Sequence, residues 1–273
     1  MSNLKSNFER KGFVTIPYPD DLHKRVLRLA EVWKKWCSLD SEIKKLFSYE
    51  DGVGYEFQDT HGNTRDLKEV FHFTGEKEEW LTQQAKNSQS KVAQELVATS
   101  REVLEHLFPE ILKYNREIEK EYGLTGLVTE IKESKNTVFI RAIHYFPGKK
   151  AGEIHAAHHV DKSGQTEHLY EDYSGVECLG SDGVWRPMPT WSDEMVAFGS
   201  MQMQLRSKNK IKALCHRVVA TNESGEHGRF AIVAFTQLAK TPTYNKKHRG
   251  RLQDLPAGFN YTLPLNEFKK FFA

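Results

Sequence analysis

The sequence has few cysteines, no long apolar run and almost no net charge, and each absence excludes a class of protein. Cys37, Cys178 and Cys215 are the only cysteines in 273 residues, and none has C-x-x-C spacing, so neither a disulfide framework nor a cysteine-rich zinc site is expected. No apolar run approaches the roughly 18 residues of a membrane-spanning helix. Lysine and arginine (39) nearly balance aspartate and glutamate (37), which does not indicate a nucleic-acid or membrane partner. Because the N-terminus also lacks the apolar stretch of a signal peptide, we expect a reduced, cytoplasmic protein.

The composition indicates a folded chain, and its histidines are unevenly distributed along the sequence. Hydrophobic residues make up 38% and aromatic residues 11% of the chain, a globular rather than a disordered composition. The length is sufficient to bury a core without disulfides or metals. Five of the twelve histidines lie close together in the sequence, namely His144, His155, His158, His159 and His168. This cluster directs attention to the middle of the chain.

Residues 1–123 predict a mostly helical N-terminal region. The expected elements are a short strand at 13–16, a helix that begins at Asp20 or Asp21 and runs to Trp36, a short helix at 41–46, and a long helix from about residue 89 to Gly123. Apolar residues recur every three or four positions in the first and last of these helices. Pro109 is expected to kink or interrupt the long helix, and Gly123 to end it.

After Gly126 the pattern changes to short strands separated by turns. The expected strands are 138–143, 175–179, 184–187, 194–198, 202–205, 213–219 and 229–235. Strands every 8–12 residues with turn residues between them favour an all-β sandwich or jelly roll. We therefore expect one domain over 1–273, with the helices of 1–123 packed outside a β core at 124–240 and a tail at 241–273 that ends in a short helix at 265–272.

A metal site is predicted from the triplet His159-Val160-Asp161. On an extended segment residues i and i+2 face the same way, so both side chains can reach one ion. His216, in a later predicted strand, is the candidate third ligand, and two histidines with one carboxylate on one face form the facial triad of non-haem Fe(II) oxygenases. An H-x-D triplet also occurs by chance. His158 is a competing ligand, but Asp161 stands at i+3 from it, off the shared face.

Two arginines are candidates for binding an anion near this site. Arg229 begins a predicted strand and its guanidinium fork is suited to a carboxylate; a surface or salt-bridged arginine is the alternative. Arg141 lies on the strand that leads to the site, where contact with a substrate and an ion pair with a neighbouring carboxylate are both open. His144, His155, His158 and His168 favour a polar or anionic small molecule. The basic stretch Lys240–Arg251 is interpreted as a solvated charge run.

Fragments along nearly the whole chain resemble, in the same order, motifs of the 2-oxoglutarate- and Fe(II)-dependent dioxygenases of the isopenicillin N synthase-like branch. Each fragment alone is weak evidence, whereas their shared order is specific. The matches are Gly12–Ile16 with the opening strand of that branch, Trp36–Lys44 with F-x-L-P-x-E-x-K, Asp66–Phe71 with D-W-K-E-x-F, His159–Glu177 with H-T-D-x-x-x-L-T-x-L-x-Q-D-x-x-G-L-Q, Gly183–Trp185 with G-x-W, and Gln204–Val219 with L-Q-x-x-S-N-G-x-x-K-S-x-x-H-R-V.

The resemblance implies a double-stranded β-helix, or jelly roll, with His159, Asp161 and His216 as iron ligands. It also implies that Arg229 holds the distal carboxylate of 2-oxoglutarate. Two positions depart from the family. Ala231 stands where the R-x-S motif has serine, and the N-Y-Y-P motif is matched by His144–Pro147, so that Phe146 replaces a tyrosine that often reaches the cosubstrate. Tyr145 and His144 are the candidates to take its place.

The activity implied by the resemblance is oxidation of a small molecule by Fe(II), 2-oxoglutarate and O2, with release of succinate and CO2. Hydroxylation, desaturation and ring closure are all compatible with it. Two alternatives remain open at this point. One is an Fe(II) oxidase of the same fold that does not use 2-oxoglutarate, and the other is a non-catalytic jelly-roll protein that binds a metal or a metabolite. The sequence does not indicate the oligomeric state.

Overall fold

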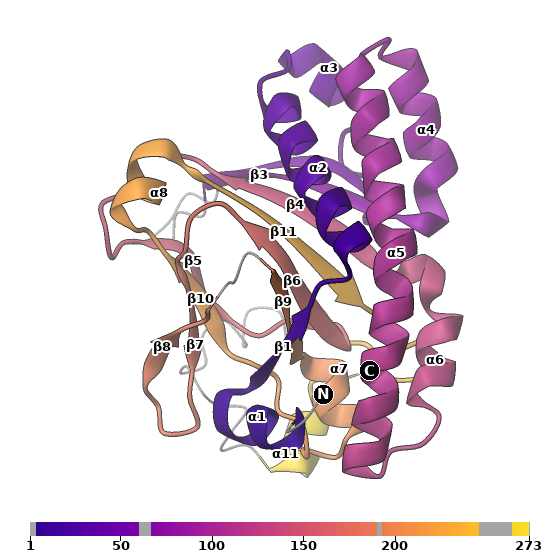
Figure 1. Cartoon of the computed structure of the whole chain (residues 1–273), viewed down its shortest axis with the longest axis vertical. Helices are drawn as coiled ribbons and strands as arrows, with labels where there is room; N and C mark the ends of the chain where they lie inside the picture. Colours follow the sequence, from indigo (N-terminus) through magenta and orange to yellow (C-terminus); the bar gives the residue numbers. More distant parts are fainter. Residues whose placement is uncertain (1–3, 60–66, 190–192, 246–263, 273) are drawn as a thin grey trace.

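Two antiparallel sheets form the centre of the molecule (Figure 1). The computed structural model describes residues 4–59, 67–189, 193–245 and 264–272. The larger sheet has the strand order β1 (Phe13–Pro17), β9 (Glu194–Gly199), β6 (Gln165–Glu171), β11 (Arg229–Thr236), β4 (Phe139–Tyr145), β3 (Leu67–Thr74) and β2 (Gly54–Asp59). The smaller sheet has the order β5 (Ile154–His159), β10 (His216–Val219), β7 (Val176–Leu179) and β8 (Trp185–Pro187). The expectation of a mainly β fold with flanking helices is confirmed.

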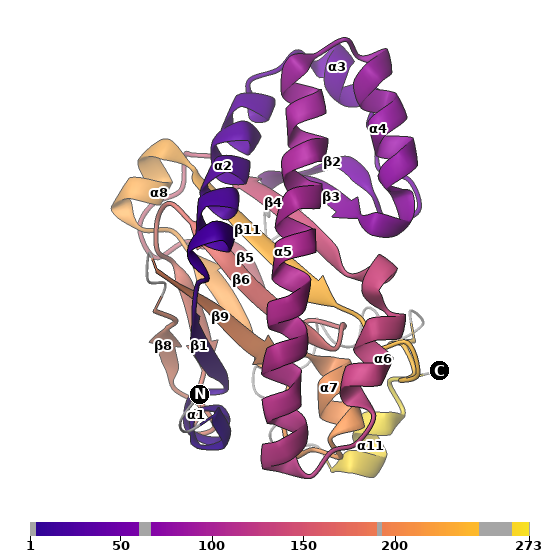
Figure 2. The ribbon, with the colours of Figure 1, turned by 45° about the vertical axis from the view of Figure 1, so that its right-hand side comes forward.

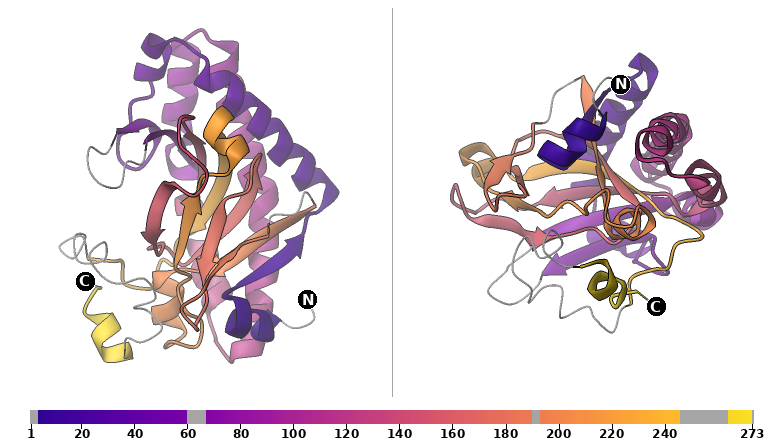
Figure 3. Two further views of the ribbon diagram at one scale, coloured as in Figure 1. Left: turned by 90° about the vertical axis from the view of Figure 1, so that its left-hand side faces the viewer. Right: turned by 90° about the horizontal axis from the view of Figure 1, so that it is seen from below.

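Helices cover one face of the larger sheet, and the smaller sheet lies on the other side. Figure 2 shows α2 (Asp20–Cys37) and α5 (Lys91–Tyr122) crossing in front of the strands, and Figure 3 shows the same layers from two further directions. The remaining helices are α1 (Leu4–Lys11), α3 (Ser41–Lys45), α4 (Glu78–Asn87), α6 (Leu127–Glu133), α7 (Met201–Arg206), α8 (Asn222–His227) and α11 (Leu265–Lys269), with single 3-10 turns at Gly75–Lys77 and Lys135–Thr137. Among the described residues, no helix has the length and apolar character needed to cross a membrane.

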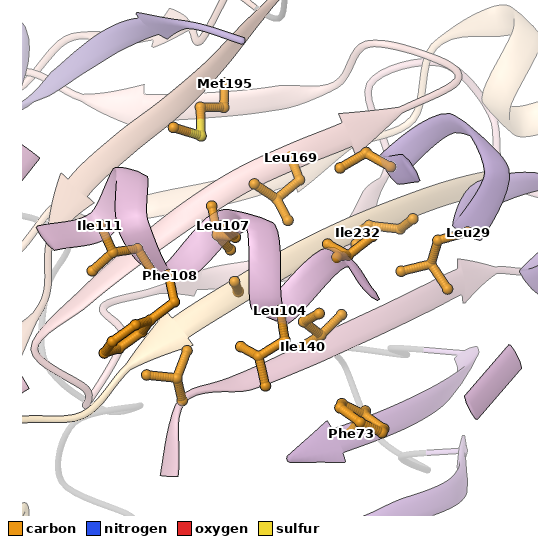
Figure 4. Close-up of a cluster of buried hydrophobic side chains, with 14 of the residues drawn as sticks. Leu29, Phe73, Leu104, Leu107, Phe108, Ile111, Ile140, Leu169, Met195 and Ile232 are labelled. Carbon is orange, nitrogen blue, oxygen red and sulfur yellow. The ribbon is translucent and has the colours of Figure 1, made fainter. Parts of the chain in front are cut away.

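The hydrophobic core lies between α5 and the helix-facing side of the larger sheet (Figure 4). Leu107 and Ile111 of α5 are fully buried against Ile140 of β4 and Ile232 of β11. Each such side chain contributes about 1.5–3 kcal/mol when it leaves water. Because strand residues alternate between faces, this packing turns the neighbours of Ile140 and Ile232 toward the smaller sheet.

The long helix α5 follows its sequence pattern closely. The Ser90 hydroxyl accepts a hydrogen bond from the Ala93 N–H (3.3 Å) and caps its start. At its end Gly123 takes a left-handed conformation (φ 61°), which a glycine adopts at little cost. Pro109 lies inside a continuous helix and does not interrupt it. The predicted helix from about residue 89 to Gly123 is therefore confirmed in extent.

Parts of the predicted secondary structure are corrected by the structure. The strand predicted at 13–16 is confirmed as β1, but the region 1–123 also contributes β2 and β3 to the larger sheet, which were not predicted. Residues 202–205, predicted as a strand, belong instead to α7, where Met201 to Gln204 are all buried. The predicted strand 213–219 is confirmed only over β10. Most of the expected tail, at 246–263, lies outside the described residues.

A buried carboxyl group, Glu167, lies on the helix-facing side of β6. Its residue is 1% exposed, and the Thr236 hydroxyl lies 3.3 Å from Oε2 and 3.4 Å from Oε1. Burial raises the pKa of Glu167 to about 8, and its polar neighbours, among them the Thr236 hydroxyl, offset only part of that rise. The group is therefore protonated in the folded protein at neutral pH.

The Glu167→Gln variant is expected to unfold at a higher temperature than the wild type at pH 9 and at nearly the same temperature at pH 5. The unfolded chain releases this proton near pH 4.3 but the folded protein only near pH 8, so the wild type loses stability as the pH rises through this window. The loss is on the order of a few kcal/mol. Thermal unfolding from pH 5 to 9 measures it, with the exposed Glu121→Gln as matched control. An unchanged pH dependence in Glu167→Gln would contradict the assignment.

Candidate active site

A cavity of about 410 Å³ lies between the two sheets. Its size is within the range of sites for small molecules and cofactors. The larger sheet lines it with residues on the face away from the helices, among them Ile143 and Tyr145 of β4 and Ala231 and Val233 of β11. The smaller sheet lines it with Ala156 and neighbouring residues of β5 and β10. The strand alternation that builds the core thus builds this cavity as well.

The three predicted metal ligands meet at one wall of the cavity. His159 ends β5, His216 begins β10, and the two residues stand opposite each other in the antiparallel pairing, with ring centroids 4.4 Å apart. Asp161 follows β5, with Oδ1 3.6 Å from His159 Nε2 and Oδ2 3.9 Å from His216 Nε2. Two ligands at about 2.1 Å from one ion and at right angles lie about 3 Å apart. Small side-chain movements therefore suffice for these atoms to share an ion.

Both imidazole rings are held in the tautomer that a metal requires. The Nδ1 of His159 lies 2.8 Å from the Ala157 carbonyl oxygen, and the Nδ1 of His216 lies 3.1 Å from that of Leu214. A carbonyl oxygen only accepts, so each Nδ1 carries the hydrogen and each Nε2 keeps its lone pair toward Asp161. The surrounding cavity walls, and next the neighbouring His216, lower the pKa of His159, although 46% of its side chain is exposed. The ring is therefore neutral at pH 7 and able to act as a ligand.

The third ligand, Asp161, is fixed and charged. The Thr166 hydroxyl donates a hydrogen bond to its Oδ2 (2.7 Å) and lies 3.1 Å from the Ser200 hydroxyl. Burial alone would raise the pKa of Asp161, but His216, His159 and the Thr166 hydrogen bond lower it. The set of two nitrogens and one carboxylate oxygen on one side of an open cavity suits a divalent metal with open coordination positions.

Arg229 lies in the same cavity and is 1% exposed. Its Nε donates to the Tyr173 carbonyl oxygen (2.9 Å), and its Nη2 donates to the Glu171 carboxylate. Its Cζ lies 5.7 Å from the centre of the Tyr145 ring. Within the described part of the chain, Nη1 has no hydrogen-bond partner. The Nη1 edge of the guanidinium therefore remains available to the carboxylate of a bound molecule. The carboxylate of Glu171 already occupies the neighbouring Nη2.

The structure distinguishes among the residues that were candidates to replace the family tyrosine. Tyr145 faces the cavity, whereas His144 lies on the opposite face of β4. There the His144 ring stacks on Phe230 (centroids 4.1 Å apart), and its Nδ1 lies 2.9 Å from Glu69 Oε1. His144 is thus displaced from the predicted cosubstrate position by the alternation of the strand. Phe146 packs against Phe57 (5.8 Å).

The other clustered histidines do not join the metal ligands. His155 is fully buried beside Tyr145 (centroids 5.3 Å apart), and neither of its ring nitrogens has a hydrogen-bond partner among the described residues. His168 Nε2 lies 3.4 Å from Glu171 Oε2. The centre of the His158 ring lies 6.5 Å from that of the Trp185 ring, and the two rings are tilted rather than stacked. Only His159 of the cluster, with His216 from outside it, meets Asp161.

A second group of potential ligands, Cys37, Glu69 and His144, lies on the helix-facing side of the larger sheet. The Glu69 carboxylate accepts hydrogen bonds from Lys44 Nζ (2.9 Å) and the Tyr55 hydroxyl (2.9 Å). Lys44 already balances the charge of this carboxylate, so the group is a buried ion-pair network. Burial is the largest influence on the Glu69 carboxyl and would raise its pKa, but hydrogen bonds from His144, Lys44 and Tyr55 lower it to about 2.

Sequence reasoning missed Glu171 as a member of the site. Its side chain is 2% exposed and pairs with Arg229. The two residues are 58 positions apart and meet only because β6 and β11 pair with Glu171 opposite Ala231. No local pattern in the sequence identifies such a partner.

Comparison with known proteins shows the fold of the chain. No family model and no curated protein sequence matches it. Among solved structures, it is similar to an oxygenase of Shewanella oneidensis (TM-score 0.72, 18% identity, 93% of this chain and 96% of the other). It is also similar to a 2OG-Fe(II) oxygenase family protein of Caulobacter crescentus (0.71, 20%, 86% and 80%) and to JOX2 in complex with 2OG, Fe and JA (0.73, 14%, 100% and 85%). The chain therefore has the fold of the 2-oxoglutarate- and Fe(II)-dependent oxygenases.

The His159→Ala and His216→Ala variants are each expected to lose the binding of one divalent metal ion. Each change leaves two ligands, which is too few to hold the ion against buffer and chelator. Metal content after equilibration with Fe(II) or Co(II) and desalting measures the effect. His158→Ala is the matched control, because it removes a neighbouring imidazole that does not approach Asp161. Metal binding equal to the wild type in either ligand variant would contradict the site.

Proposed function

We propose that the protein is an Fe(II)- and 2-oxoglutarate-dependent dioxygenase that oxidises a small molecule with release of succinate and CO2. One observation carries the proposal: His159, Asp161 and His216 present their ligand atoms within 4.8 Å of one another, at the wall of a cavity, in a chain that has the fold of such oxygenases. The contacts of both Nδ1 atoms with backbone carbonyl oxygens support the proposal, because they leave each Nε2 lone pair available to a metal.

The residues of the chain orient the reactants and exclude water. His159, Asp161 and His216 would hold the iron, which together with 2-oxoglutarate and O2 supplies the power to oxidise an unactivated C–H bond. Thr166 fixes the Asp161 carboxylate. Ile143, Val233 and their neighbours give the cavity apolar walls that keep water from the reacting atoms. Cys215, next to His216, is buried, and we propose no redox role for it.

Arg229 is proposed to hold the distal carboxylate of 2-oxoglutarate through its available Nη1 edge. Tyr145, beside Arg229 in the cavity, is proposed to complete this position in place of the family tyrosine. Ala231 provides no hydroxyl there. Glu171 already occupies Nη2 of the arginine, so the cosubstrate carboxylate would lie near a second negative charge.

The same observations favour one alternative function, an Fe(II) oxidase of this fold that does not use 2-oxoglutarate. Glu171 neutralises the arginine that would select a dicarboxylate, and Ala231 removes a supporting hydroxyl. A site of this kind would bind iron and a substrate, and O2 reduction would draw its electrons from the substrate alone.

Several finer features belong to the proposal. We propose that the two sheets have jelly-roll connectivity and that residues 1–273 form a single oxygenase domain, because both sheets line one cavity. A small-molecule substrate, rather than nucleic acid or a membrane, agrees with the size of that cavity. The cytoplasm agrees with three free cysteines, two of them buried.

Anaerobic addition of Fe(II) and 2-oxoglutarate tests the proposed function. The proposed dioxygenase is expected to develop the visible charge-transfer band that requires both to be bound together, and to release succinate when a substrate is supplied from a metabolite collection. The oxidase alternative predicts iron binding without this band. Absence of the band in protein that contains one equivalent of iron would overturn the use of 2-oxoglutarate.

Changes at Arg229 and at Glu171 are expected to shift the half-saturating concentration of 2-oxoglutarate in opposite directions. Arg229→Ala should raise the half-saturating concentration about tenfold or more, since a charge-assisted contact is lost. Glu171→Gln should lower it, since a neighbouring negative charge is removed. Titration of the charge-transfer band measures both.

Two controls separate these effects from misfolding and from iron loss. Arg229→Ala leaves Glu171 buried without its cation, which destabilises a protein, so the double variant Arg229→Ala/Glu171→Gln is measured beside it. Iron content should stay at the wild-type level in all three variants. An unchanged 2-oxoglutarate requirement in both arginine variants would show that Arg229 has only a structural role.

A further inference from the structure

A second arginine, Arg141, faces the cavity from the middle of β4. It stands opposite Val233 of β11, whereas Arg229 stands opposite Tyr145. The levels of the two arginines are therefore four residue steps apart, which corresponds to about 13 Å along the strand. Both line the same cavity. The cavity thus has two cationic positions too far apart to bind the same carboxylate.

Arg141 differs from the other cations of the cavity because it has no counter-ion. Its side chain makes no ion pair or hydrogen bond with any described residue, and its buried Nε is without a partner. Arg229, by contrast, pairs with Glu171. Lys162 lies over the Tyr244 ring (4.7 Å) and Lys68 over the Tyr145 ring (5.6 Å).

Aromatic rings hold the Arg141 guanidinium in place without satisfying its N–H groups. Its Cζ lies 4.8 Å from the ring centre of Phe235 and 5.8 Å from that of Phe139, and these two rings stack 4.8 Å apart. Such contacts use the flat face of a guanidinium and leave its edge free for hydrogen bonds. The group is therefore positioned in advance for a planar, doubly accepting partner such as a carboxylate.

Once the metal site is filled, the carboxylate with the largest effect on Arg141 no longer compensates its charge. The other carboxylate that acts on Arg141, Glu56, has a smaller effect and lies 3.7 Å from His72 Nε2. Burial lowers the pKa of Arg141, and Asp161 is the carboxylate that most offsets this effect. A metal ion on Asp161 would take up that negative charge. Among the described residues that line the cavity, Asp161 is the only acid, against Lys68, Arg141, Lys162 and Arg229. A half-buried cation with a buried, unpartnered Nε is stabilised by an anion from outside the chain.

We propose that Arg141 binds the carboxylate of the organic substrate, and that this substrate is a small carboxylic acid with an apolar body. The apolar body matches the walls around Arg141, which include Val70, Ile143 and Phe235. Because Arg229 is assigned to the cosubstrate, Arg141 is a specificity-determining residue for the second reactant. This assignment rests on the proposed function, which places the reaction at the His159–Asp161–His216 wall.

Binding of matched acids and amides tests the proposal. The probes are benzoate, phenylacetate and hexanoate, each compared with its primary amide, which has the same shape without the charge. They are titrated into the protein loaded anaerobically with Fe(II) and 2-oxoglutarate, where perturbation of the visible band reports binding near the iron. The same probes are titrated into the metal-free protein with ligand-observed NMR, which requires neither activity nor iron.

The wild type is expected to prefer at least one acid over its amide by on the order of tenfold. Arg141→Gln should reduce this preference to within about twofold, and Arg141→Lys should retain part of it. Arg186→Gln should behave like the wild type, because it removes the same charge from an exposed residue outside the cavity. Melting temperatures confirm that each variant is folded.

Each outcome decides one of the two proposals separately. If none of the acids is preferred, or if the preference survives in Arg141→Gln, Arg141 is not the carboxylate site. If Arg141→Gln instead weakens 2-oxoglutarate binding in the absence of any probe, the arginine belongs to the cosubstrate and the substrate assignment is overturned. If the wild type forms no visible band while the metal-free protein shows the Arg141-dependent preference, the proposed function fails and the carboxylate site stands.

Discussion

Successive residues of a β-strand face opposite sides of its sheet, and this constraint separates the apolar core of the protein from its polar cavity. On β4, Ile140 and Ala142 pack beneath the helices, while Arg141, Ile143 and Tyr145 face the smaller sheet. On β11, Ile232 belongs to the core and Arg229 to the cavity. A shift of one residue in either strand would turn the core-facing side chains toward the cavity and the cavity-facing side chains toward the core. The burial of the apolar side chains therefore fixes the orientation of those that line the cavity.

The candidate metal ligands depend on a second consequence of sheet geometry. Antiparallel pairing of β5 with β10 places His216 opposite His159, and Asp161, two residues beyond His159, lies on the same wall. Backbone carbonyl oxygens of Ala157 and Leu214 then orient both rings. The candidate site is thus supported by backbone groups within or next to the strands, as a preorganised metal site would be.

Charge balance organises the rest of the cavity. Glu171 neutralises Arg229, and the histidines and Thr166 stabilise the Asp161 carboxylate. On the other side of the sheet Lys44 balances Glu69. Arg141 stands apart from this pattern, because aromatic rings hold it but no described residue forms an ion pair with it. Charges that lose water are normally paired, and this is why we place an external anion at this half-buried arginine.

The sequence by itself determined the features that depend on neighbouring residues. The H-x-D spacing on an extended segment, the apolar periodicity of α5 and its end at Gly123 are all local properties, and the structure agrees with them. Only the tertiary structure decided that β2 and β3 extend the larger sheet, that His144 faces away from the cavity and that Glu171 meets Arg229. These features depend on strand register between segments far apart in the chain, and register is set by the packing of the whole core.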